Sequence, residues 1–254
     1  MRIFTFNVNG IRAAIKKGLL EWLQSESPDV LCLQEIKLHE TDLVQPDFEA
    51  LGYECYWYPA QKKGYSGVAI LTKVSPKKVE YGMNVELFDF EGRVISTEFD
   101  QFKLICAYFP SGTTGDIRQD IKMSFLNDIQ GYITEQKKIH KNILLCGDVN
   151  ICHKAIDIHN PVSNKNSSGF LPEEREWVGQ FLDTGFTDTF RHFNDEPDHY
   201  TWWSYRAGAR GNNKGWRIDY FFASEEMNDL LADSKIHPDV VMSDHCPVSL
   251  TLKT

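Results

Sequence analysis

Short strand-like runs of apolar residues recur along the whole chain, and several follow one another with no helix between them. The runs Val94–Phe99 and Lys103–Phe109 are joined by a tight polar turn, which favours an antiparallel hairpin. A purely parallel, doubly wound sheet needs a crossover between consecutive strands, so this succession argues against one. Strands are predicted at Ile3–Asn7, Val30–Gln34, Tyr53–Tyr58, Gly67–Thr72, Val94–Phe99, Lys103–Phe109, Ile143–Cys146, Ile218–Ala223 and Val248–Leu252.

Helical patterns fall between some of these runs. A long helix is predicted where apolar residues recur at every fourth position, with Asp116 as its N-cap. Its apolar positions are Ile117, Ile121, Phe125, Ile129 and Ile133. Another helix is predicted after Leu171, because Pro172 suits the first helical position and acids follow it. Two shorter helices are predicted, one that ends at Ser27-Pro28 and one at Glu225–Ala232.

Composition and length bound the kind of protein this is. The chain has 254 residues, of which 42% are apolar and 25% charged, as in an ordinary globular protein. No Pro/Gly-rich linker divides it, so a single domain over residues 1–254 is predicted. No apolar run reaches the roughly 18 residues that span a bilayer, and Met1–Asn7 has no signal-peptide pattern. We therefore expect a cytoplasmic protein with no membrane partner.

Charge and cysteine usage narrow the function further. The net charge of −9 argues against loose, non-specific nucleic-acid binding, but it leaves room for one basic face. None of the six cysteines forms a Cys-x-x-Cys pair, which argues against zinc and thioredoxin-like sites. Because most lie in apolar strand-like runs, the cysteines are expected to be reduced structural thiols.

Polar clusters follow the ends of five apolar runs. Two of them combine acids with an amide or an imidazole, namely Gly147-Asp148-Val149-Asn150 and Ser243-Asp244-His245. The others are Phe6–Gly10, Leu33–Glu35 and Tyr108–Gly112. One such cluster alone is commonly a turn or a cap. Five together, all offering oxygen ligands or acid–base groups, indicate a hard metal ion and phosphate chemistry.

In order and spacing, these clusters resemble the exonuclease III / apurinic-apyrimidinic endonuclease branch of the endonuclease–exonuclease–phosphatase superfamily. The matching motifs are Phe6–Ala13, Leu33–Lys37, Tyr108–Pro110, Gly147–Asn150, Gly169–Arg175, Trp216–Tyr220 and Ser243–Pro247. The resemblance implies an α/β (α+β) fold, a four-layer α/β sandwich in which two packed, mostly antiparallel sheets are flanked by helices. It also implies a DNA repair nuclease that cleaves 5′ to abasic sites and acts at DNA 3′ ends.

A divalent-metal site is part of what the resemblance implies. Glu35 is predicted as the principal Mg²⁺ ligand, because a hard cation prefers carboxylate oxygens and an apolar strand holds this residue. Mn²⁺ is expected to substitute for Mg²⁺. The other candidate metal ligands are Asn7, Asn9, Asp148, Asn150, Asp244 and His245.

Roles in catalysis follow for five residues. Asp148 is predicted to orient or deprotonate the attacking water, and the amide of Asn150 to donate to a phosphoryl oxygen. His245 is predicted to donate to, or protonate, the same phosphate. Asp219 resembles its partner carboxylate, which would fix the imidazole and raise its pKa. Tyr108 is predicted to contact the phosphate through its hydroxyl.

The segment from Tyr200 to Arg217 interleaves basic residues with large aromatic ones, which suggests phosphate contacts beside an apolar wall. The resemblance implies that Trp202, Trp216 and Ile218 line a pocket for an abasic deoxyribose that excludes a sugar still carrying its base. The other predicted DNA contacts are Arg12, Asn164, Arg206, Arg210 and Lys214. The expected partner is duplex DNA with abasic sites or blocked 3′ ends, and the protein is expected to be a monomer.

Three positions depart from the eukaryotic members of this branch, which tend to carry Asp where Asn9 stands and Asn where Ser111 and Ser167 stand. Because Ser111 and Ser167 fall on DNA-facing loops, the balance between abasic cleavage, 3′-end cleaning and exonuclease action stays open.

One alternative is a phosphatase or phosphodiesterase of the same superfamily that acts on a non-DNA phosphate ester. Another is a binding module without activity, against which the intact set of candidate catalytic residues argues.

Overall fold

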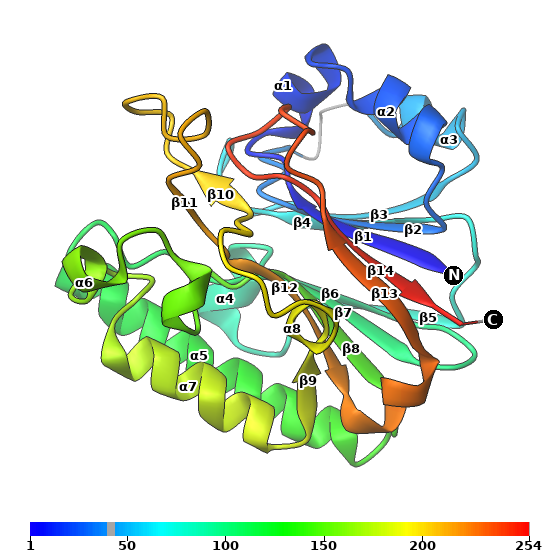
Figure 1. The fold of residues 1–254 in the computed structure, drawn as a ribbon. Helices are drawn as coiled ribbons and strands as arrows, with labels where there is room; N and C mark the ends of the chain where they lie inside the picture. Colours follow the sequence, from blue (N-terminus) through cyan, green and yellow to red (C-terminus); the bar gives the residue numbers. More distant parts are fainter. Residues whose placement is uncertain (40–43, 254) are drawn as a thin grey trace.

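Two six-stranded sheets pack face to face in the computed structural model, which describes residues 1–39 and 44–253 (Figure 1). The first sheet has the order β13-β14-β1-β2-β4-β3. Its strands are β1 (Arg2–Asn7), β2 (Val30–Gln34), β3 (Glu54–Tyr58), β4 (Val68–Thr72), β13 (Leu231–Ile236) and β14 (Val248–Leu252). Only β1 and β2 run parallel among the pairs described in this sheet.

The second sheet has the order β5-β6-β7-β8-β12-β9, and in its described part only β7 and β8 run parallel. Its strands are β5 (Lys78–Tyr81), β6 (Val94–Glu98), β7 (Lys103–Tyr108), β8 (Ile143–Asp148), β9 (Phe186–Asp188) and β12 (Asp219–Ser224). A separate two-stranded hairpin joins β10 (Trp202–Trp203) to β11 (Gly215–Trp216). The prediction of two mostly antiparallel sheets is therefore confirmed.

Helices cover the outer face of each sheet, which completes the four predicted layers (Figure 1). Over the first sheet lie α1 (Ile11–Lys16), α2 (Leu19–Glu26) and α3 (Gln45–Glu49). Over the second lie α4 (Glu86–Phe90), α5 (Asp116–Lys137) and α7 (Pro172–Asp183). The remaining helices are α6 (Pro161–Asn164), α8 (Thr189–Phe193) and the 3₁₀ turns η1 (Ala155–Asp157) and η2 (Glu225–Leu230). Within the described ranges, no helix is long and apolar enough to cross a membrane.

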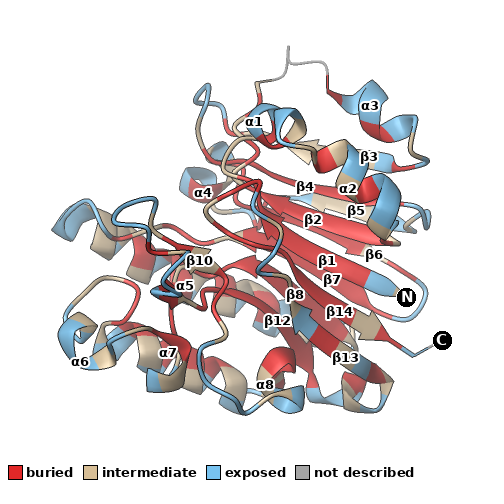
Figure 2. Cartoon of the chain, turned by 45° about the horizontal axis from the view of Figure 1, so that its top comes forward, coloured by how far each residue is buried: buried red, intermediate tan, exposed pale blue. Residues whose placement is uncertain are grey.

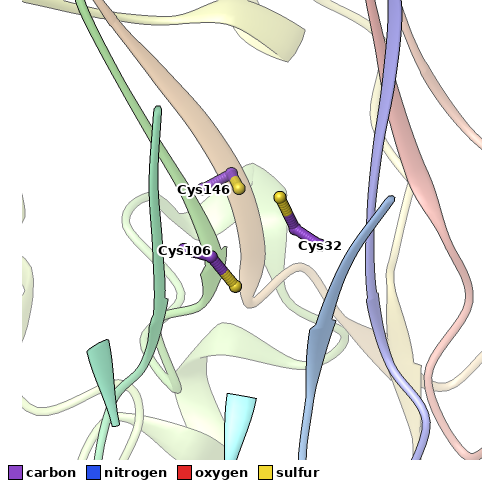
Figure 3. Close-up of side chains that lie close together, drawn as sticks. All are labelled: Cys32, Cys106 and Cys146. Atoms are coloured by element: carbon purple, nitrogen blue, oxygen red, sulfur yellow. The ribbon is translucent and has the colours of Figure 1, made fainter. Parts of the chain in front are cut away.

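One of the hydrophobic cores lies between the sheets, whose central strands are buried along their whole length (Figure 2). Cys32 of β2 faces Cys106 of β7 and Cys146 of β8 across this interface, and their Sγ atoms lie within 4.8 Å of one another (Figure 3). All six cysteines are free, as expected of structural thiols. This core holds the two sheets in a fixed relation, so residues at their ends are rigidly placed.

Two of the helix predictions are wrong, one in its N-cap and one in its type of structure. Asp116 is the first helical residue of α5 and makes no side-chain cap; Gly115 is the N-cap, with a φ of 105° that suits glycine. The helix predicted at Glu225–Ala232 is a 3₁₀ turn as far as Leu230, after which the chain becomes β13. Pairing with β14 satisfies the backbone of this segment, which overrides its helical pattern.

The polar clusters meet at one edge of the sandwich, away from the two termini (Figure 1). Parallel pairing brings the end of β1 beside the end of β2, and the end of β7 beside the end of β8. Asp148 at the end of β8 pairs with Tyr108 on one side and with Asp219 at the start of β12 on the other. The strand order itself therefore gathers the predicted catalytic residues.

Candidate active site

A cavity of about 780 Å³ opens at this edge of the sandwich. One side of it is polar, and the other side is walled by Trp202, Trp216 and Ile218. The polar residues that line it and were predicted from the sequence are Glu35, Tyr108, Asp148, Asn150, Asp244 and His245. Ser111 and Ser167, the two departures on the loops, also line it.

Glu35 lies just beyond β2 in a left-handed backbone conformation, with φ of 48°. Its Oε1 accepts a hydrogen bond from Asn7 Nδ2 at 2.9 Å, and its Oε2 lies 2.9 Å from the Nζ of Lys37. Burial raises the pKa of Glu35, but the Lys37 ammonium and the hydrogen bonds from Asn7 and Lys37 outweigh it and lower the pKa overall. Glu35 is thus held as a carboxylate.

Asp148 is fixed by amide groups on both sides. Its Oδ2 accepts from Asn7 Nδ2 at 2.8 Å, and its Oδ1 accepts from the backbone N–H of Asn150 at 2.9 Å. Burial raises the pKa of Asp148 to about 8; His245 lowers it, while Asp219 and Glu35 raise it further. Once ionised, a carboxylate with a raised pKa accepts a proton more readily than an ordinary aspartate does.

His245 and Asp219 form a buried pair. The imidazole Nδ1 lies 2.9 Å from Asp219 Oδ2, which leaves Nε2 facing Asp148 Oδ2 at 3.8 Å. Burial lowers the pKa of His245, but the Asp219 and Asp148 carboxylates more than offset this and raise the pKa to about 10. With its pKa raised in this way, the imidazole carries a proton on both nitrogens near neutral pH, and its Nε2–H faces Asp148 at the cavity.

Oxygen and nitrogen donors of Glu35, Asp148 and His245 converge so that one ligand atom of each lies within 4.8 Å of the others. A cation is already accommodated nearby, because the Lys37 ammonium contacts Glu35 Oε2 and also donates to Asn9 Oδ1. Carboxylate and amide oxygens are the donors that a hard divalent cation prefers. The residues present therefore fit a metal of the Mg²⁺ type.

Asp244 connects the polar side of the cavity with its aromatic wall. Its Oδ1 accepts from Asn9 Nδ2 at 2.9 Å, and its Oδ2 accepts from the indole Nε1 of Trp202 at 3.0 Å. Burial raises the pKa of Asp244, but the charge of His245 and then the hydrogen bonds from Asn9 and Trp202 outweigh it and lower the pKa overall. Asp244 lies outside the group of Glu35, Asp148 and His245, whose ligand atoms converge.

The aromatic wall is built by the β10–β11 hairpin. Trp202 pairs with Trp216 across the hairpin, and their rings meet edge to face with centroids 6.0 Å apart. Both rings pack against buried Ile218 and Phe170. Thr201, which the sequence did not single out, accepts hydrogen bonds from the N–H groups of Ile218 and Asp219 and so joins the wall to β12.

None of the five other predicted DNA contacts, Arg12, Asn164, Arg206, Arg210 and Lys214, lines the cavity. Arg12, Arg206 and Lys214 are exposed, and the amide of Asn164 donates to nearby backbone carbonyls. Arg210 is different: its guanidinium donates to the carbonyls of Ser243, Pro238 and Val240 and lies over the ring of Trp203. It therefore braces the loop that carries Asp244 and His245.

Two further charged residues shape the site without having been predicted. Lys37 belongs to a matched motif, so its proximity to Glu35 could have been suspected. Arg93 gave no signal; it is buried, donates to the carbonyl of Tyr108 at 2.9 Å and lies over the Tyr108 ring at 4.9 Å. Burial and the nearby carboxylates of Glu35 and Asp148 raise the pKa of Tyr108, so its hydroxyl stays a donor.

The whole chain is similar to proteins that act on nucleic acids. The model of the Endonuclease/Exonuclease/phosphatase family matches residues 4–245. An exodeoxyribonuclease of Bacillus subtilis (strain 168) is 44% identical over 254 residues, covering 99% of each chain. The DNA repair nuclease APEX1 of Danio rerio is 43% identical over 259 residues, covering 99% of this chain and 82% of its own. A solved 3′ phosphatase from Neisseria, bound to a product DNA hairpin, is 27% identical, with a TM-score of 0.93 and both chains fully covered.

Proposed function

The chain belongs to the Endonuclease/Exonuclease/phosphatase family, and from that premise we propose that it is a Mg²⁺-dependent DNA repair nuclease of the exonuclease III type. It hydrolyses phosphodiesters 5′ to abasic sites in duplex DNA and acts on DNA 3′ ends as an exonuclease and 3′-phosphatase. One observation carries the proposal: Glu35, Asp148 and the Asp219–His245 pair converge in a cavity that an aromatic wall closes on the other side. The names of the relatives support it.

Asp148 is placed to act as the base. Asn7 and Asn150 hold its two oxygens, so the carboxylate cannot rotate away while it orients a water and accepts its proton. His245, held by Asp219, donates from Nε2 to a phosphoryl oxygen as negative charge develops there. Asn150 adds a donor when its amide exchanges its bond to the carbonyl of Phe109 for one to the phosphate.

Glu35 is the proposed principal metal ligand, and Asn7, Asn9, Asp148, Asn150 and Asp244 are the other candidates. The sequence also predicts His245 as a ligand, but an imidazole protonated on both nitrogens has no lone pair for a metal, so its proposed role is that of the donor to the phosphate. When bound, a divalent ion supplies positive charge that neutralises the phosphate and the departing oxygen. Mg²⁺ suits an oxygen-rich set with few protein ligands, and Mn²⁺ is the expected substitute. Tyr108, with its hydroxyl protonated, donates to the phosphate on the same side.

The aromatic wall gives the proposed substrate choice. Trp202, Trp216 and Ile218 leave room beside the catalytic groups for a deoxyribose without its base, while an intact base would collide with the indole rings. We further propose that the protein works as a monomer on one duplex. Arg12, Asn164, Arg206, Arg210 and Lys214 remain proposed DNA contacts outside the cavity.

The test is a panel of three duplex DNAs: an internal abasic analogue, a 3′-phosphate at a nick and a matched blunt end. Each is incubated with Mg²⁺, with Mn²⁺ and with EDTA. The proposal predicts metal-dependent cleavage of all three, leaving 3′-hydroxyl ends. Cleavage in EDTA, or hydrolysis of a small phosphate ester with none of the DNAs cleaved, would refute it and favour the alternative within the superfamily.

A further inference from the structure

A buried ion pair lies behind the cavity and has no part in the proposed mechanism, although one of its members falls within the matched motif Gly169–Arg175. Lys122 of α5 and Glu174 of α7 are both wholly buried, and the Nζ of Lys122 lies 2.6 Å from Glu174 Oε1. Charged side chains are seldom fully buried, and burying an ion pair is often no more stabilising than an apolar substitute. The pair therefore calls for a role other than stability.

Lys122 reaches the floor of the cavity through one carbonyl. Its Nζ donates to the backbone oxygen of Asn150 at 2.8 Å. Asn150 is in a left-handed conformation, with φ of 57°, and its own N–H and side-chain amide bond to Asp148 Oδ1 and the Phe109 carbonyl. The ammonium thus clamps the backbone of the residue that fixes the proposed base.

Glu174 reaches the wall of the cavity instead. Its Oε2 accepts from the N–H groups of Gly169 at 2.6 Å and Leu171 at 2.9 Å, and its Oε1 accepts from Gln119 at 3.0 Å. Gln119, Gly169 and Leu171 all line the cavity, whereas Lys122 and Glu174 do not. A Cβ at Gly169 would lie 2.9 Å from the Trp216 ring and 3.2 Å from the Asn150 carbonyl, so this segment fills the space between wall and floor.

We infer that Lys122 and Glu174 are positioning residues, which set the distance between the catalytic floor at Asp148 and Asn150 and the substrate wall at Gly169 and Trp216. The inference rests on the proposed function and deepens it. Because neither residue touches the substrate, loss of the pair acts through Asn150 and through Gly169. Misplacing a catalytic group by about 1 Å can cost about 100-fold in rate, so the effect falls on kcat.

The variants are Lys122→Met, Lys122→Arg, Glu174→Gln and the double variant Lys122→Met/Glu174→Gln. Lys103→Met is the matched control, because Lys103 is also buried and paired with an acid, Glu80, but sits at the other end of β7 from the cavity. Each is assayed for kcat and KM on the three DNAs, at a temperature where thermal melts show it folded. Amide hydrogen exchange at Gly169 and Leu171 is measured in parallel.

Lys122→Met and Glu174→Gln are expected to lower kcat by about 100-fold with KM changed less than about threefold. Lys122→Arg should restore about tenfold of that loss, since it keeps a buried cation. The double variant should cost no more than either single change, because the two residues act as a unit. Gly169 and Leu171 should exchange faster in Glu174→Gln than in Lys103→Met, which should keep its kcat.

Folded Lys122→Met or Glu174→Gln with a kcat within about threefold of wild type would overturn the inference, as would an equal loss in Lys103→Met. If Lys122→Met does not fold, Glu174→Gln decides, because it keeps the shape and one acceptor oxygen. A wild-type protein that cleaves none of the DNAs refutes the proposed function instead. In that case unchanged exchange at Gly169 and Leu171 in Glu174→Gln would still disprove the link between the pair and the wall.

Discussion

At the scale of single residues, the site depends on side chains whose orientation is fixed by a neighbour. Asp219 Oδ2 holds His245 through Nδ1, and Asp219 Oδ1 has no hydrogen-bond partner among the described residues. The side-chain amide of Asn7 donates hydrogen bonds to two carboxylates, those of Glu35 and Asp148. A change at one such residue is therefore felt by the group that it holds.

Asp219→Asn and His245→Gln are each expected to lower kcat by about 100-fold or more, because an imidazole without its carboxylate loses both orientation and charge. The double variant should lose little beyond either single change. His237→Gln is the control, since His237 bonds Ser249 away from the cavity. Simple multiplication of the two single losses in kcat would show that Asp219 and His245 work independently.

At the scale of elements, the β10–β11 hairpin supplies the wall, and the strand ends supply the floor. The hairpin strands have two residues each, so its geometry depends on Trp202 against Trp216 and on the cap that Thr201 gives to β12. The loop with Ser167 closes the far side of the cavity. Substrate choice belongs to these elements, while hydrolysis belongs to the sheet.

Trp216→Ala is expected to relax the discrimination between baseless and intact nucleotides by about tenfold, because a smaller wall leaves space for a base. Metal-dependent hydrolysis should persist, since the wall carries no catalytic group, and Trp216→Phe should keep most of the discrimination. Ser167→Asn should shift activity toward internal abasic cleavage. The measurement is kcat/KM on the three DNAs; unchanged ratios in Trp216→Ala and Ser167→Asn would place specificity elsewhere.

The sequence predicts those strands in which an apolar run is followed by a clear polar end. Apolar runs with a polar cluster behind them located the main strands and, through them, the site residues. Strands β9, β10 and β11 are too short to carry a periodicity, so they were missed. Strand β13 was also missed, because a helix was predicted over its first residues, where pairing with β14 decides the backbone. Composition marked Arg210 as a DNA contact, but it could not indicate the four backbone carbonyls to which its guanidinium donates.

At the scale of the whole molecule, a buried charge network ties the wall to the second sheet. Arg217, next to Trp216, bonds Asp157 Oδ1 at 2.8 Å and Asp188 Oδ2 at 2.7 Å, and Arg191 also bonds Asp157. Burial raises the pKa of Asp157, but the Arg217 and Arg191 guanidinium groups outweigh it and lower the pKa to about 2.

A carboxyl whose pKa is lowered on folding stabilises the folded state above its unfolded pKa and ceases to do so as pH falls through its folded pKa. Asp157 should therefore make its full contribution to the free energy of unfolding above about pH 4. About 2 kcal/mol of that contribution should be lost by pH 2. Asp157→Asn should destabilise by about 3–5 kcal/mol at pH 7, because it leaves buried arginines short of a partner. Urea unfolding of both proteins from pH 7 to pH 2 measures these free energies. If Asp157→Asn loses stability with falling pH as steeply as wild type does, groups other than Asp157 cause the acid sensitivity.

The central claim is that the gathered strand ends form a metal-dependent phosphodiesterase site around Glu35. Its most direct test is Mg²⁺ titration of Glu35→Gln, by calorimetry and by cleavage of the abasic duplex, beside Glu176→Gln, an exposed acid of α7. We predict that Glu35→Gln needs far more Mg²⁺ for activity and that its kcat falls by about 100-fold or more, because an amide keeps an oxygen but loses the charge. Glu176→Gln should match wild type. Wild-type turnover in EDTA, or in Glu35→Gln at limiting Mg²⁺, would contradict the claim.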